Sequence, residues 1–169
     1  MTCVIVNDAS SLIDLRKGGL LDGLCNLTYR CIVPLPVRES EVLCFSDRQW
    51  LLLDKAGMVT YDLTPEEVAQ SLAVKERHPG LSANDCFCFV TALAHAGILL
   101  TGDALLRKVA SSNGLCVHGV LWIVDELDAV GGCARSLLIQ ALTKWRDDDT
   151  VFLPQHEVAN RLERLAALP

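Results

Sequence analysis

Four acidic residues occupy positions from which their carboxylates could act together. Two aspartates follow short apolar runs, a third begins a long apolar segment, and a glutamate follows another apolar run. Crowded carboxylates repel one another, and a hard divalent cation such as Mg²⁺ or Mn²⁺, which prefers oxygen ligands, relieves that repulsion. Such an ion can activate a water molecule for attack on a phosphodiester bond. The candidate metal ligands are Asp8, Asp85, Asp103 and either Glu39 or Glu41.

The elements around these residues are expected to alternate between strand and helix. Short β-branched runs predict strands buried on both faces, as in a parallel sheet. Capped segments with glycine stops predict helices between them. The expected strands are 3–8, 30–34, 58–63, 98–101 and 115–118, and the expected helices are 10–18, 20–26, 36–56 with a break near Ser46, 64–77, 83–96, 104–112, 120–130, 134–149 and 152–168. This order predicts a three-layer α/β/α fold with a central parallel sheet of four to five strands.

The predicted fold brings the acidic residues to one edge of the sheet. In open parallel sheets, ligands bind at the carboxyl ends of the strands, near the point where strand order reverses. Asp8 and Asp103 follow strands, and the two glutamates follow strand 30–34. Asp85 begins a helix that runs antiparallel to the next strand, so the N-terminus of that helix lies at the same edge.

Each carboxylate also has a purely structural interpretation. Asp85 stands three residues after Ser82 and fits a capping box, and Asp103 fits an ordinary N-cap. Asp8 could cap the following helix, although Ser10 competes for that role, and the glutamates fit a solvated helix face. The metal-site hypothesis depends on the convergence of four chain segments on one edge.

The bulk properties limit the class of protein. A chain of 169 residues predicts one domain, residues 1–169. The net charge of −6 argues against a protein that coats nucleic acid, but it is compatible with a nuclease that carries an acidic site. The eight cysteines form no CxxC, and no signal peptide or membrane-spanning run is evident, so we expect a cytoplasmic protein. The hydrophobic share of 51% hints at an oligomer interface.

The stretch VIVNDASSLIDLRKGGLL resembles the opening of PIN-domain proteins, with Asp8 as the aspartate at the strand end. The stretch LSANDCFCFVTALAHAGILLTGDALLRKVA resembles their second signature, with Asp85 at the helix start and Thr101 and Asp103 in a T-x-D motif. The closing LPQHEV and RLERL resemble the VapC-type toxin ribonucleases of this family. The resemblance covers nearly the whole chain.

The resemblance implies a Mg²⁺- or Mn²⁺-dependent endoribonuclease that acts on RNA and forms a homodimer, the toxin of a toxin–antitoxin pair inhibited by an antitoxin protein. Asp8, Asp85 and Asp103 would be catalytic metal ligands, and Thr101 would orient an aspartate or a water. The fourth family carboxylate precedes an apolar residue, which favours Glu41 over Glu39.

Some family members carry another polar ligand one turn after the last aspartate. Here Leu106 and Arg107 occupy that region, which favours one metal site over two.

Two other classes of function are considered. A PIN-like binding or regulatory module with weak or no nuclease activity would fit the missing later ligand and the acidic charge. A different acidic-site phosphotransfer enzyme fits less well, because the triplet from Asp8 is not D-x-D, and the nucleotide-binding motifs GxxxxGK[ST] and GxGxxG are both missing.

Overall fold

The computed structural model describes residues 3–167. A five-stranded, fully parallel sheet with the order β3-β2-β1-β4-β5 forms its centre. The strands are β1 (Val4–Asn7), β2 (Arg30–Pro34), β3 (Val59–Tyr61), β4 (Ile98–Leu100) and β5 (Cys116–His118). All five expected strands are therefore present, β2 with the expected bounds and the other four shorter, and the predicted three-layer α/β/α class is confirmed.

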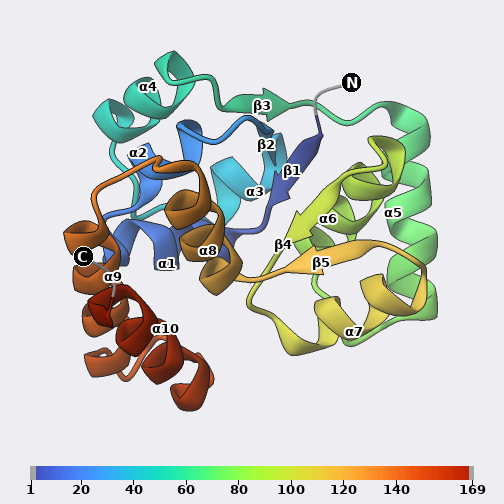
Figure 1. The fold of residues 1–169 in the computed structure, drawn as a ribbon. Helices are drawn as coiled ribbons and strands as arrows, with labels where there is room; N and C mark the ends of the chain where they lie inside the picture. Colours follow the sequence, from blue (N-terminus) through green and yellow to red (C-terminus); the bar gives the residue numbers. More distant parts are fainter. Residues whose placement is uncertain (1–2, 168–169) are drawn as a thin grey trace.

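Helices cover both faces of this sheet (Figure 1). The helices α5, α6 and α7 lie on one side, with α6 packed on β1, β2 and β4, whereas α1, α2, α8 and α9 pack together on the other. The helices are α1 (Ala9–Gly18), α2 (Leu21–Cys25), α3 (Leu35–Ser40), α4 (Asp47–Lys55), α5 (Pro65–Arg77), α6 (Ala83–Ala94), α7 (Ala104–Ser112), α8 (Val120–Val130), α9 (Arg135–Asp147) and α10 (Gln155–Ala167). The expected end of the last helix at residue 168 lies outside the described residues.

The strand order reverses between β1 and β4. The chain moves from β1 outward to β2 and β3, then crosses back to β4 on the other side of β1. The two central strands are paired from Ile5 and Ile98 to Asn7 and Leu100, and the Asp8 amide continues the ladder to the Leu100 carbonyl at 3.0 Å. Adjacent parallel strands whose crossovers leave in opposite directions open a crevice at their carboxyl ends. Asp8 stands in that position.

The expected helix over residues 36–56 is wrong in its first half. The helix α3 ends at Ser40, because the amides of Glu41 and Val42 both turn back to the Val37 carbonyl. Glu41 is therefore the C-cap of a short helix and does not lie in its first turns. The predicted break is confirmed, since Ser46 and Gln49 form a capping box that begins α4.

The core consists of aliphatic side chains from the sheet and from the inner faces of the helices. Ile5, Val6, Ile32 and Leu99 are completely buried at its centre, and Trp145 of α9 is 1% exposed. Within residues 3–167 no helix has the length and apolar character needed to cross a membrane.

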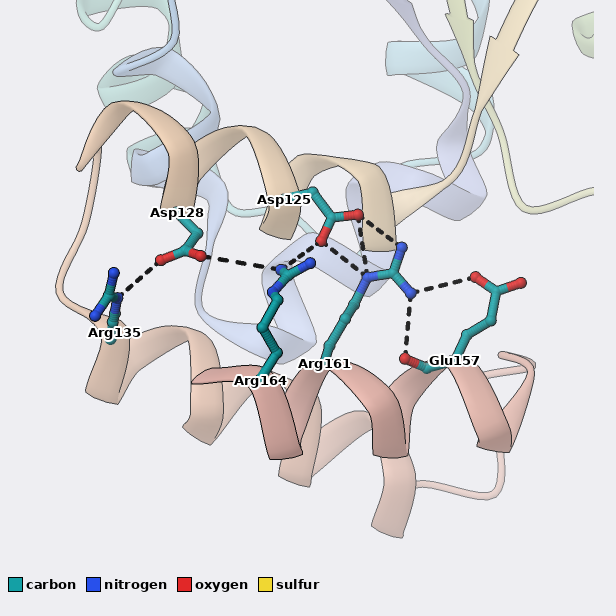
Figure 2. Close-up of polar contacts among 6 residues, drawn as sticks. All are labelled: Asp125, Asp128, Arg135, Glu157, Arg161 and Arg164. Atoms are coloured by element: carbon teal, nitrogen blue, oxygen red, sulfur yellow. Dashed lines mark hydrogen bonds and ion pairs between the residues drawn. The ribbon is translucent and has the colours of Figure 1, made fainter. Parts of the chain in front are cut away.

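Ion pairs fasten the last helix to α8. Arg161 of α10 donates to both oxygens of Asp125 on α8, with its Nη2 at 2.6 Å from Oδ2, and Arg164 lies 2.7 Å from Oδ1 (Figure 2). Arg161 also reaches Glu157 one turn earlier, at 3.3 Å. Of the α10 side chains that are described, only Val158 and Leu165 are buried. The position of α10 therefore depends strongly on this charged network.

We expect Asp125→Ala to lower the free energy of unfolding by about 1–2 kcal/mol, because it leaves the largely buried Arg161 guanidinium without its main acceptor. Chemical denaturation at low and high salt measures the effect, which should shrink at high salt. The control is Asp147→Ala, which breaks an exposed pair with Arg146 and should leave the unfolding midpoint unchanged. Equal effects of the two substitutions would contradict the role of Asp125.

Candidate active site

Asp8 is the buried centre of the acidic edge. It is 4% exposed and caps α1, with Oδ1 accepting from the Ala9 amide at 2.7 Å. Its Oδ2 accepts from the Ser10 hydroxyl at 2.7 Å and from the Thr101 hydroxyl at 2.8 Å. The expected N-cap role of Ser10 is wrong, because Asp8 takes that position. Ser10 serves Asp8 instead.

Two hydroxyl groups join Asp8 to the turn after β4. The Thr101 hydroxyl donates to Asp8 and accepts from the Asp103 amide at 3.0 Å. The Ser10 hydroxyl donates to Asp8 in the same way and accepts from the Gly102 amide at 3.1 Å. The carboxylate of Asp8 therefore fixes the conformation of residues 101–103 through two parallel relays. The orienting role expected of Thr101 is compatible with this geometry, and the matching contact of Ser10 was not anticipated.

Asp103 and Asp85 both lie at helix N-termini. Asp103 is exposed and caps α7, with its Oδ1 accepting from the Leu106 amide at 2.7 Å. Asp85 completes the capping box of α6, with Oδ2 accepting from the Ser82 amide at 2.6 Å. The structural interpretations of Asp8, Asp85 and Asp103 as helix caps thus hold, and they place each carboxylate at the positive end of a helix dipole.

The charge of Asp85 contributes to the raised pKa values of two other carboxylates at this edge. Burial raises the pKa of Asp8, the hydrogen bonds from Ser10 and Thr101 lower it, and the charge of Asp85 raises it again. Glu41 is largely exposed, yet partial desolvation raises its pKa, and the charges of Asp8 and Asp85 add to that rise. Both glutamates were candidates, and the charge coupling with Asp8 and Asp85 supports Glu41. Asp103 is joined to this group through Thr101.

The fit of a metal ion to this edge is incomplete. Oxygen donors of this kind suit Mg²⁺ or Mn²⁺. The buried amide oxygen of Asn7, the residue before Asp8, also has no hydrogen-bond partner in the part of the chain that the structure describes. However, no three histidine, cysteine, aspartate or glutamate side chains within residues 3–167 are grouped so that they could hold a metal ion. The expected single cluster of Asp8, Glu41, Asp85 and Asp103 is thus not assembled as a ligand set.

A cleft of about 680 Å³ lies next to this edge, and we call it the α7–α10 cleft. It extends from Gly102 between α7, the turn after β5 and the start of α10. Asp14 of α1 lines it, and burial raises the pKa of Asp14 to about 6, against the opposing effect of Lys17 and with smaller contributions from the charges of Asp148 and Asp8. A carboxyl with a pKa near neutrality in a cleft is a frequent mark of a functional site.

No local sequence pattern distinguishes Asp14, because an aspartate among helical residues also fits a solvated helix face. Its partial burial results from the packing of distant segments around α1, which local sequence does not reveal.

A protein-family model described as a PIN domain matches residues 4–166, nearly the whole chain. The chain belongs to the PIN-domain family. No curated protein matches it. PIN domains are generally nucleases that act on nucleic acid with divalent metal ions, which agrees with an acidic edge at the carboxyl ends of parallel strands. The family resemblance is confirmed, while the VapC-type assignment stays a prediction.

We expect Thr101→Val to lower the free energy of unfolding by about 1–3 kcal/mol, because it removes one of the two hydroxyl donors of the buried Asp8 Oδ2 and takes away the acceptor of the Asp103 amide. Thermal denaturation measures the change. Thr91→Val is the matched control, since Thr91 is equally buried and its hydroxyl has no hydrogen-bond partner in the described residues. A neutral or stabilising effect at both positions would show that the Thr101 relay contributes nothing.

Asp14→Asn is expected to stabilise the protein at pH 8 by about 1 kcal/mol, after allowance for solvent screening of a half-exposed carboxyl. The folded pKa of about 6 exceeds the ordinary value of 3.8, so the natural protein loses stability as the pH rises between these values, whereas the asparagine variant does not. Unfolding free energies measured from pH 3.5 to 8 should therefore diverge with increasing pH. Parallel curves for the natural protein and Asp14→Asn would contradict the raised pKa of Asp14. The control is Asp62→Asn, which changes an exposed aspartate.

Proposed function

We propose that this protein is an endoribonuclease that hydrolyses phosphodiester bonds of RNA at the acidic edge around Asp8. The observation that supports this most strongly is the position of the buried Asp8 carboxylate, held by Ser10 and Thr101 at the switch point between β1 and β4 of a PIN domain. Ligands of open parallel sheets bind at that point.

The residues of this edge would each have a limited task in hydrolysis. Asp8 is rigidly placed by three donors, so it can hold a water or a cation in a fixed position. Asp85, Asp103 and Glu41 supply further negative charge from three other segments. Phosphoryl transfer demands mainly positioning and charge neutralisation, and carboxylates suffice for the first of these.

Dependence on Mg²⁺ or Mn²⁺ is part of the proposal. The donors Asp8, Glu41, Asp85 and Asp103 have the oxygen chemistry that these ions prefer. Burial is the main cause of the raised pKa values of Asp8 and Glu41, and the charge of Asp85 adds to both, a repulsion that a cation relieves. A bound ion would neutralise the charge of the phosphate and activate water. Since the carboxylates are not grouped as a ligand set, the metal requirement is decided by the activity assay.

The finer assignments are proposed on the resemblance of the sequence to toxin-type PIN proteins. They comprise a role as the toxin of a toxin–antitoxin pair, inhibition by an antitoxin protein, a homodimer and a cytoplasmic location. Exposed apolar side chains on α5, such as Leu72 at 60% exposure, are compatible with such an interface.

A second candidate function is a PIN-like binding or regulatory module with weak or no nuclease activity. It is favoured by one observation, the absence within residues 3–167 of three grouped metal-ligating side chains. The two functions differ in whether the protein cleaves RNA when Mg²⁺ or Mn²⁺ is added.

We expect Asp8→Asn and Asp103→Asn each to reduce RNA cleavage roughly 100-fold or more, because a neutral amide cannot replace an anionic oxygen donor. Asparagine caps helices as well as aspartate, so circular dichroism should show the same folded signal. A labelled RNA incubated with Mg²⁺ or Mn²⁺, or with EDTA, reports cleavage on a denaturing gel.

The control for this experiment is Asp47→Asn, which alters an exposed aspartate in the first turn of α4 and should keep full activity. Full cleavage by both site variants, or equal cleavage in EDTA and in Mg²⁺ or Mn²⁺, would contradict the proposal of a metal-dependent nuclease. No cleavage by the natural protein with either ion would favour the binding module.

A further inference from the structure

The α7–α10 cleft begins where the acidic edge ends. Gly102, whose amide donates to Ser10, belongs to both the Asp8 relay and the cleft lining. One wall of the cleft is the side of α7 that carries Arg107 and Lys108, and the other is the segment that leads into α10. A linear substrate bound at Asp8 could therefore extend into this cleft.

Aromatic rings line this cleft in an arrangement that suits nucleobases. His118 and Trp122 are stacked at the turn between β5 and α8, with ring centroids 4.3 Å apart and planes inclined by 14°. Phe152, in the segment that leads into α10, also lines the cleft and is 88% exposed. Nucleobases stack on exposed aromatic rings whatever their sequence, so Phe152 offers a flat surface for a base.

The charges of the cleft are unevenly neutralised. Arg161 is shared between Asp125 and Glu157, and Arg164 also pairs with Asp125, so the α8–α10 wall is internally compensated (Figure 2). Arg107 and Lys108 on the facing wall form no ion pair within residues 3–167. Unpaired cations are notable in a chain of net charge −6, and they complement a phosphate backbone.

Arg107 and Lys108 differ in what holds them. The Arg107 Nη2 donates to the Thr101 carbonyl at 2.9 Å, so this guanidinium is part of the turn that follows β4. Lys108 is exposed. Lys108 can therefore be changed without disturbing the Asp8 relay.

We infer that the α7–α10 cleft binds the single-stranded RNA that leads away from the cleavage site, with a base stacked on Phe152 and a phosphate contacting Lys108. This inference rests on the proposed ribonuclease function. A partner protein is the alternative occupant, since the lining also contains apolar residues such as Leu121 and Leu153. The cations of α7 beside the aromatic rings favour RNA, because they complement a phosphate backbone.

The test is a titration of the full-length protein with a fluorescein-labelled single-stranded RNA in EDTA, read by fluorescence anisotropy at several salt concentrations. Phe152→Ala should weaken binding about tenfold, the loss typical of one base–aromatic stack, without changing the salt dependence. Lys108→Gln should reduce the slope of log K against log salt by about 0.7, the value for one phosphate contact of a single strand.

The matched controls are Leu52→Ala, which truncates an exposed apolar side chain on α4, and Lys55→Gln, which removes an exposed lysine at the end of α4. Both should bind RNA like the natural protein. Unchanged affinity and slope in both cleft variants would overturn the inference and leave the cleft to a protein partner, as would failure of the natural protein to bind RNA.

Because binding is measured without cleavage, the inference and the proposed function can fail separately. A protein that binds RNA through Phe152 and Lys108 but never cleaves it would support the cleft and contradict the ribonuclease. A protein that cleaves RNA and binds it independently of both side chains would do the reverse.

Discussion

A single buried carboxylate organises the carboxyl edge of the central sheet. Asp8 is taken out of water at the end of β1, which by itself favours its protonated form. Two hydroxyls and one amide oppose that penalty, and the same hydroxyls bind the amides of Gly102 and Asp103. Helix α1 and the turn before α7 are therefore built around one acceptor, and neither can shift without leaving it unsatisfied.

The carboxylates of this edge serve the fold, and under the proposed function they would serve the active site as well. Asp8, Asp85 and Asp103 each bind an amide at the N-terminus of a helix, where the dipole stabilises negative charge. Capping and catalysis are therefore not competing explanations, because the cap is what keeps an aspartate at the carboxyl end of a parallel sheet.

The sequence predicted those features that depend on local periodicity and on topology. Buried β-branched runs gave the five parallel strands, and the rule for switch points located Asp8 correctly. The sequence did not predict features that depend on packing. Helix α3, for example, stops at Ser40, because the chain turns back to Val37. The partial burial of Asp14 and the exposure of Phe152 arise from helices distant in sequence, so no local pattern carried a signal for either.

An acidic protein that cleaves RNA must overcome repulsion between its own charge and that of the substrate. The carboxylates around Asp8 increase that repulsion where the scissile phosphate would sit, and a divalent cation offsets it there. The rest of the strand needs a separate source of attraction. The α7–α10 cleft would supply it, because Arg161 and Arg164 already pair with Asp125 and Glu157 on α8 and α10 and leave Arg107 and Lys108 free of ion pairs in residues 3–167. Under the proposed function, the α8–α10 ion pairs would therefore bear on substrate binding as well as on stability.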